Sequence, residues 1–183
     1  MRITGGALTG RRVAVPPGEI RPAMDRMRES LFNILGPLVG FSFLDLFCGS
    51  GIMTLEAISR GATRATLVER DRKKRTVIVR NLELAHETEC PSPRLVMAPV
   101  ESFVAREKRR YDIVYLDPPF RYRHKPDLIG RIASAALLEP EGRLLIHYPR
   151  EDQLPDEIGG LVLTDERAYG RSTVRFYDAP PEA

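Results

Sequence analysis

The sequence has no tryptophan and only two cysteines, Cys48 and Cys90. Two thiols are too few for a structural zinc site, and the three histidines have no spacing typical of a metal site. The sequence also lacks an apolar run long enough to cross a bilayer, and its first residues, MRITGGALTGRR, lack the apolar core of a signal peptide. We therefore expect a cytoplasmic protein with free thiols, no bound metal and no membrane contact.

The length of 183 residues predicts a single domain, 1–183, with a core large enough to need no disulfide. The net charge is only +3, but the first 28 residues hold six arginines and two acids. An arginine-rich end on a nearly neutral body favours a phosphate-rich partner, although a solvated basic face would give the same pattern.

The first 40 residues contain two elements. In residues 1–20, the segments RIT and RRVAV flank GGALTG, which predicts a small β-hairpin. In residues 21–40, apolar side chains recur at helical spacing and Gly36-Pro37 follows as a stop signal. The predicted apolar stripe of this helix consists of Met24, Met27, Leu31, Ile34 and Leu35.

From residue 41 to 183, short apolar runs alternate with helical patterns, which predicts an α/β core. The expected strands are 41–47, 63–69, 94–98, 111–116 and 142–148, and an antiparallel hairpin over 160–178 closes the chain. The expected helices are 51–61, 72–86, 100–107 and 126–138. This pattern predicts a mostly parallel seven-stranded sheet, whose ligands would bind beyond the carboxyl ends of the strands.

The first of these strands ends in DLFCGSG, residues 45–51. Gly49 and Gly51 allow a sharp turn and the close approach of a ligand. Thr54 occupies the place of the third glycine in the dinucleotide fingerprint, and the P-loop lysine is absent, which argues against a bound pyrophosphate.

Acidic residues accompany this glycine turn. Asp45 precedes it, and Glu69 ends the second strand, where a carboxylate can accept hydrogen bonds from ribose hydroxyls. Glu69 could instead be a helix N-terminal acid favoured by the helix dipole. A buried Asp45 needs a cationic partner, and the set fits S-adenosylmethionine, whose sulfonium and amino acid would lie near the loop.

The fourth strand ends in DPPF, residues 117–120. Prolines alone would explain a turn, but not the acid or the aromatic ring. The amino group of a nucleobase is a poor nucleophile that benefits from hydrogen-bond acceptors and a stacking surface. Asp117 and the Pro118 carbonyl are such acceptors, Pro119 helps to fix their direction, and Phe120 is a stacking platform.

DLFCGSG, Glu69 and DPPF together resemble the Rossmann-like class I methyltransferases that use S-adenosylmethionine to modify amino groups. With RITGGALTGRRVAVP, IRPAMDRMRESLFNIL, EAISRGA and YGRSTVRFY, the sequence is identified as a member of the RsmD family, the bacterial 16S rRNA guanine-N2 methyltransferases. The resemblance runs over nearly the whole chain.

The resemblance implies three groups of site residues and a partner, 16S rRNA or the assembling small subunit. The implied cofactor-binding residues are Asp45, Phe47, Gly49, Ser50, Gly51, Glu69 and Arg70. The implied catalytic residues around the target guanine are Asp117, Pro118, Pro119 and Phe120. The implied RNA-binding residues are Arg2, Arg11, Arg12, Arg21, Asp25, Arg26, Arg28, Arg121 and Arg123, with Pro22 in the same stretch before the first helix. We expect a monomer.

The sequence departs from the family pattern at three places. Ala23 stands where a threonine is usual, and Cys48 where alanine is common. After the third strand, Ala98 and Pro99 replace the acid that would accept a hydrogen bond from the adenine amino group, so backbone groups would have to recognise adenine.

Three other functions remain as alternatives. A C5-pyrimidine methyltransferase would need a thiolate, for which Cys90 is a poor candidate because it has no activating neighbour. An N6-adenine methyltransferase would share DPPF but normally carries a target-recognition domain. A non-catalytic RNA-binding protein on the same fold is disfavoured by Asp117, Gly49 and Gly51.

Overall fold

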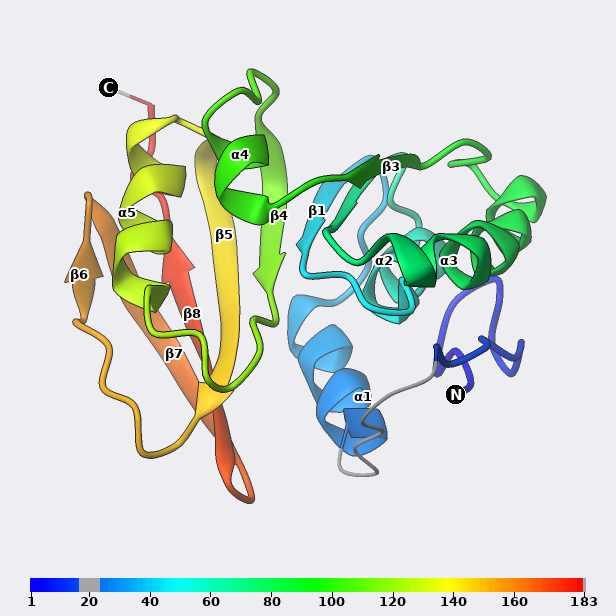
Figure 1. The fold of residues 1–183 in the computed structure, drawn as a ribbon, viewed down its shortest axis with the longest axis horizontal. Helices are drawn as coiled ribbons and strands as arrows, with labels where there is room; N and C mark the ends of the chain where they lie inside the picture. The colour runs from blue at the N-terminus through cyan, green and yellow to red at the C-terminus, as the bar shows by residue number, and fades with distance from the viewer. Residues whose placement is uncertain (17–23, 183) are drawn as a thin grey trace. The chain divides into compact units, whose positions relative to one another are not determined.

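The computed structural model describes residues 1–16 and 24–182. The chain forms two compact units, Met1–Ala98 and Pro99–Ala183, which we describe separately (Figure 1). The predictions for Arg21 and Pro22 lie outside the described residues, and the single domain stays a prediction. Within the described ranges, no helix has the length and apolar character needed to span a bilayer.

The first unit is a three-stranded parallel sheet with helices. Its strands are β1 (Ser42–Leu46), β2 (Arg64–Glu69) and β3 (Arg94–Met97). The central strand, β2, pairs with both neighbours, so that Thr66 lies beside Leu44 of β1 and Arg94 of β3. The helices are α1 (Met24–Leu35), α2 (Ile52–Ser59) and α3 (Arg75–Leu82), with 3-10 turns η1 (Arg72–Lys74) and η2 (Glu83–Glu87) on either side of α3. The predicted helix over 72–86 is therefore three consecutive helical segments.

The N-terminal hairpin is confirmed in a minimal form. A single antiparallel bridge joins Arg2 and Arg12, and the Ile3 N–H donates to the Arg11 carbonyl at 3.0 Å. The buried side chains of Ile3, Leu8 and Val13 anchor this segment to the unit. The hairpin is therefore held by side-chain burial more than by a strand ladder.

Helix α1 buries a different set of residues from the predicted stripe. Met27, Leu31 and Phe32 are buried, but Ile34 is 36% exposed. The side chain of Arg28 is buried on this helix as well, because it pairs with a buried acid described below. Gly36, with φ of 71°, follows the last turn as predicted.

The second unit is a five-stranded sheet whose strand order is β4-β5-β8-β7-β6. Its strands are β4 (Tyr111–Leu116), β5 (Leu138–Pro149), β6 (Glu157–Ile158), β7 (Leu161–Tyr169) and β8 (Ser172–Asp178). β4 and β5 are parallel, and the remaining pairs are antiparallel. Helices α4 (Val100–Val104) and α5 (Lys125–Ser134) cover one face of this sheet (Figure 1).

The strand count and several boundaries differ from the prediction: β5 begins at Leu138 where 142 was predicted, and α4 ends at Val104 where 107 was predicted. The described residues form eight strands where we predicted seven, because the two-residue β6 pairs with the start of β7. The predicted helix over 126–138 ends at Ser134, since Ala136 has a φ of 52° and Leu138 already belongs to β5. Short pairings of this kind leave no periodic signal in a sequence.

Candidate functional site

The first candidate site is the turn after β1, residues 47–51, which we call the glycine loop. Phe47, Gly49 and Gly51 have φ values of 66°, 57° and 80°. These left-handed conformations explain the two glycines, and Phe47 adopts one at a cost. A Cβ added to Gly51 would lie 3.1 Å from Leu67 Cδ2, whereas a Cβ at Gly49 would meet nothing within 4 Å. The backbone of Gly49 is therefore open to a ligand.

Asp45 lies beneath the glycine loop and is buried. Its Oδ2 accepts a 2.8 Å hydrogen bond from the Thr54 hydroxyl on α2. The residue that breaks the dinucleotide fingerprint thus orients the carboxylate that precedes the loop. This pairing gives Thr54 a role that a third glycine could not fill.

Glu69 connects the end of β2 to the same loop. One carboxylate oxygen accepts from the Gly49 N–H at 3.1 Å, and the other accepts from the Asp71 N–H at 2.9 Å. Lys74 Nζ lies 3.4 Å from the carboxylate. Because a carboxylate has about four acceptor directions, it retains capacity for a further donor. Glu69 therefore holds the glycine loop and the backbone turn after β2 together, and its binding of ribose hydroxyls stays a prediction.

Asn81 of α3 is a site residue that the sequence interpretation missed. Its Nδ2 donates to the carbonyl of Ser50 and to that of Ala14, both at 2.9 Å, and its Oδ1 accepts from the Ala14 N–H. Ser50 itself is buried, whereas Arg70 is exposed. In the sequence, this role is indicated only by an asparagine among the apolar positions of the helix.

A buried ion cluster corrects the prediction for Arg28. Its side chain is 1% exposed, and its Nε donates to Glu56 Oε1 of α2 at 2.8 Å. Glu56 also pairs with Arg60 and accepts from the Thr4 N–H at 2.9 Å. The prediction that Arg28 binds RNA is wrong, because a fully buried Glu56 requires cationic partners and holds this guanidinium inside.

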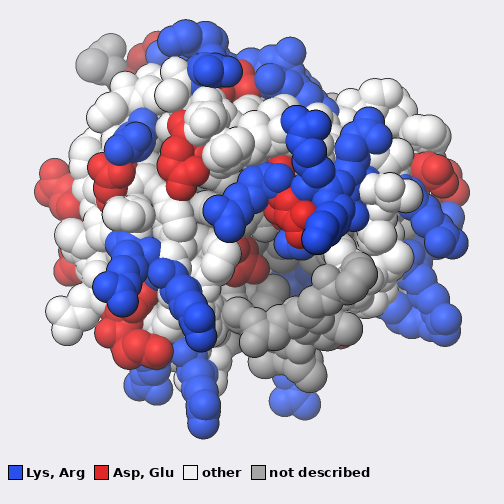
Figure 2. Space-filling model, in the orientation of Figure 1, with Lys and Arg blue, Asp and Glu red and all other residues white. Residues whose placement is uncertain are grey.

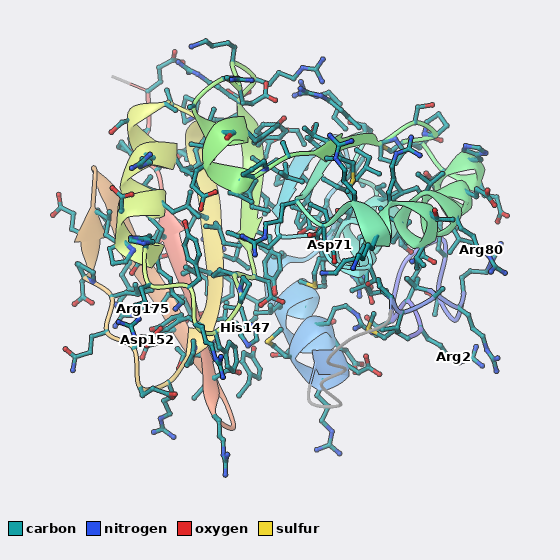
Figure 3. All side chains as sticks on the ribbon, viewed as in Figure 1. Arg2, Asp71, Arg80, His147, Asp152 and Arg175 are labelled. Carbon is teal, nitrogen blue, oxygen red and sulfur yellow. The ribbon has the colours of Figure 1, made fainter. Side chains whose placement is uncertain are left out.

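Exposed arginines of the N-terminal segment line a groove of about 950 Å³ in the first unit. We call it the arginine groove; its basic residues are Arg2, Arg11, Arg12 and Arg80, and its acids are Asp25, Glu83 and Glu87. Figure 3 shows Arg2 and Arg80 at the edge of this unit, both pointing outward. Arg80 was not predicted. Arg26 is also exposed, on α1.

Charges in the arginine groove are partly balanced. Arg11 Nη2 lies 3.0 Å from Glu87 Oε1, and this hydrogen bond raises the pKa of Arg11 and lowers that of Glu87. Asp25 pairs with the buried Arg28 at 2.9 Å, so it does not neutralise an exposed arginine. Figure 2 shows basic side chains on the drawn face with acids interspersed among them.

The second candidate site is the DPPF turn, residues 117–120, directly after β4 in the second unit. Asp117 Oδ1 lies 2.8 Å from His147 Nδ1 on β5. Pro118 is buried and Pro119 is exposed, and the Tyr122 N–H donates to the Pro119 carbonyl at 2.7 Å. The hydrogen bond that closes this turn is therefore accepted by the Pro119 carbonyl and not by the Pro118 carbonyl.

Lys125 holds the end of the DPPF turn and the residues after it by hydrogen bonds. Its side chain is buried, and Nζ donates to the Phe120 carbonyl at 3.3 Å and to Asp152 Oδ2 at 2.6 Å. The Tyr122 hydroxyl donates to Glu101 Oε1 of α4 at 2.7 Å, and burial together with this acid raises the pKa of Tyr122. These contacts fix the segment that carries the exposed Arg121 and Arg123.

The two thiols do not provide a nucleophile. Burial raises the pKa of Cys48 well above its usual value, and Asp45 and Glu69 raise it further. Burial also raises the pKa of Cys90. Both therefore stay protonated near neutral pH, which disfavours the thiolate chemistry of a C5-pyrimidine methyltransferase. In the described part of the chain, no group of three metal-ligating side chains comes together.

The sequence and structure match known proteins over almost their full length. The family described as "Conserved hypothetical protein 95" matches residues 1–178. "Ribosomal RNA small subunit methyltransferase D" of Escherichia coli K12 is 36% identical over 97% of this chain and 89% of its own length. The protein of the same name from Haemophilus influenzae is 31% identical over 97% of this chain and 93% of its own length.

A solved structure, the yhhF protein of Escherichia coli, superposes with a TM-score of 0.86 at 34% identity and covers 100% of this chain and 99% of that chain. The predicted α/β class, with mostly parallel strands and a C-terminal antiparallel pair, is confirmed as the fold of this group. The chain belongs to the Conserved hypothetical protein 95 family, the RsmD family of ribosomal RNA small subunit methyltransferases.

Proposed function

We propose that this protein transfers the methyl group of S-adenosylmethionine to the exocyclic N2 of a guanine in small-subunit (16S) ribosomal RNA. The observation that carries the proposal is Asp117, a carboxylate at the end of β4 that is 22% exposed and oriented by a hydrogen bond. Membership of the family supports methyl transfer to ribosomal RNA, and the acceptor chemistry of DPPF supports an amino group as the target.

The glycine loop fits the donor. An open backbone at Gly49, with the carboxylates of Asp45 and Glu69 close by, suits a ligand with an amino acid group and a ribose. The N-terminus of α2 begins directly after the loop and favours the ligand's carboxylate. When bound, S-adenosylmethionine supplies an electrophilic methyl group on a positively charged sulfur.

The DPPF turn fits the acceptor. Asp117 and the Pro118 carbonyl would each accept a hydrogen bond from the guanine amine, which directs its lone pair toward the methyl carbon. The amine nitrogen forms the new N–C bond as the C–S bond breaks, and Asp117 accepts the proton that nitrogen then releases. Phe120 would stack on the base, which has to leave its own stack to reach the turn.

The arginine groove and Arg121 and Arg123 would hold the RNA backbone. Arginine guanidinium groups match phosphate geometry and remain charged at any physiological pH. Exposed arginines of this kind fix the position of a nucleic acid without reading its sequence. Selection of one guanine therefore depends on the shape of the substrate, either 16S rRNA or a partly assembled small subunit.

The test is a nucleoside analysis. Small subunits and naked 16S rRNA from cells that lack this gene are incubated with the purified protein and S-adenosylmethionine, then digested and analysed by mass spectrometry. We expect one N2-methylguanosine per RNA. N6-methyladenosine would support the adenine alternative, and no methylation of either substrate would leave only the non-catalytic RNA-binding alternative.

A further inference from the structure

His147 occupies a place beside Asp117 that the pairing of their strands dictates. β4 and β5 run parallel, with Tyr115 opposite Leu145 and Leu116 opposite Ile146. One step further along this register places Asp117 beside His147. Directly opposed side chains on neighbouring strands are close enough to interact, and the 2.8 Å contact between Oδ1 and Nδ1 follows from this alignment.

The contact matches one tautomer of the imidazole. Beside an ionised carboxylate, which can only accept hydrogen bonds, the 2.8 Å contact is satisfied by the tautomer of His147 that carries its proton on Nδ1. The other ring nitrogen, Nε2, is buried and has no hydrogen-bond partner among the described residues. The imidazole is 2% exposed, and within the described residues its ring forms a hydrogen bond with Asp117. The hydrogen bond of the imidazole in this structure is therefore made with the Asp117 carboxylate.

The same ring also contacts the aromatic member of the DPPF turn. The centroids of His147 and Phe120 are 5.7 Å apart, and the ring planes meet at 66°. Such an edge-to-face arrangement is a favourable geometry for two aromatic rings. One buried side chain of β5 thus contacts both the acid and the stacking platform of the turn.

We propose that His147 is a positioning residue, which sets the carboxylate of Asp117 and the ring of Phe120 in the geometry needed for methyl transfer. This inference rests on the proposed function of Asp117. By occupying Oδ1, the Nδ1–H group leaves the second carboxylate oxygen for the amine of the target base. A displacement of about 1 Å at a reacting group is enough to slow a reaction about 100-fold.

Variants that preserve or remove one nitrogen test the proposal. In His147→Asn, the amide nitrogen is as many bonds from the backbone as Nδ1, so a donor to Asp117 is retained. In His147→Gln, the amide nitrogen corresponds in place to Nε2, and that donor is lost. His147→Leu removes both nitrogens. His86→Asn and His86→Leu are matched controls, since His86 is exposed on η2.

We expect the turnover number of His147→Gln and His147→Leu to fall roughly 10-fold to 100-fold, as when a residue that orients a reacting group is lost. The affinity for S-adenosylmethionine should be unchanged, and His147→Asn should retain most of the turnover. A merely structural role would not separate Asn from Gln. Equal turnover in Asn and Gln, or full turnover in His147→Leu, would overturn the proposal.

Asp117→Ala is measured in parallel so that two failures are distinguishable. If Asp117→Ala keeps its turnover, the proposed function of Asp117 fails. If only the His147 variants keep theirs, the positioning role alone fails. Should His147→Leu unfold, the comparison of His147→Asn with His147→Gln still decides, because both side chains are polar and similar in size to histidine.

A ¹⁵N spectrum of the histidine side chains gives a separate readout. In the wild type, Nδ1 of His147 should be protonated, and its signal should change in Asp117→Ala. An unchanged Nδ1 signal in Asp117→Ala would contradict the proposal.

Discussion

The side-chain amide of Asn81 on α3 donates to the carbonyl of Ser50 in the glycine loop at 2.9 Å. The same amide exchanges two hydrogen bonds with the backbone of Ala14 in the N-terminal segment. One buried side chain therefore joins the loop proposed to bind the methyl donor with the segment that forms the arginine groove.

Asn81→Asp should weaken the binding of S-adenosylmethionine roughly 10-fold, by analogy with the loss of other residues that orient a binding group. Replacing the NH₂ group by oxygen turns two hydrogen bonds into contacts between acceptors, while the acceptor for Ala14 is retained. The measurement is isothermal titration calorimetry. Asn33→Asp on the exposed face of α1 is the matched control. Equal affinity in both variants would show that Asn81 does not support the loop.

Glu56→Gln should destabilise the protein strongly, because it removes the buried carboxylate that pairs with Arg28 and Arg60 and leaves Arg28 only the largely exposed Asp25. Breaking a buried ion pair by removing one partner typically costs about 3–5 kcal/mol. Urea unfolding measures this change. The control is Asp127→Asn, which breaks the exposed pair between Asp127 and Arg131 and should cost about 0–1 kcal/mol. A similar cost for both variants would contradict the buried cluster as a source of stability.

The buried thiol of Cys48 predicts a loss of stability at alkaline pH. Burial raises its pKa in the folded state above the usual value of 9.0, so folding favours the neutral thiol. The stabilising contribution of the buried thiol is fully present below the pKa that Cys48 has in the unfolded chain. It is lost as the pH rises from that value toward the pKa of Cys48 in the folded protein. The free energy of unfolding should therefore fall less between pH 8 and about 10 in Cys48→Ala than in the wild type. If the free energy of unfolding falls equally with pH in both proteins, the pKa of Cys48 is not raised in the folded state. Rapid alkylation of native Cys48 by iodoacetamide at pH 8 would refute the raised pKa as well.

Arg12→Glu and Arg80→Glu should each weaken RNA binding and reduce its dependence on salt. A lost phosphate contact lowers the slope of log affinity against log salt by about 1. Arg11→Glu, predicted to weaken binding as well, should also break the pair with Glu87. Filter binding with 16S rRNA at several salt concentrations gives the slopes, with Arg131→Glu on α5 as a charge-matched control. If all four variants lose affinity equally, the arginine groove has no special role.

The sequence pattern predicted the fold class and the position of the two motifs at strand ends, because both depend on local signals. The alternation of strands and helices, the turn glycines and DPPF are each recognisable from a short stretch of the sequence. Contacts between distant segments could not be predicted in this way. Arg28 looked like an RNA-binding arginine until Glu56 of α2 was found beside it, and Ile34 lies on the helix face that this pairing leaves outside.

The same limit applied to the DPPF turn. His147 and Lys125 lie 30 and 8 residues after Asp117 in the sequence, and the only expectation for the histidines was that their spacing does not suit a metal site. Only the register of β4 and β5 brings His147 beside the acid. Support of this kind depends on tertiary pairing, for which hydrophobic periodicity carries no information.

The central claim is that Asp117 acts on the methyl acceptor and not on the donor. Transfer from labelled S-adenosylmethionine to 16S rRNA or small subunits tests it, with calorimetric binding of S-adenosylmethionine to the same preparations. For Asp117→Ala we predict a loss of turnover of about 100-fold or more, as for other groups that stabilise a transition state, and an unchanged affinity for S-adenosylmethionine. Retained turnover in Asp117→Ala would contradict the account.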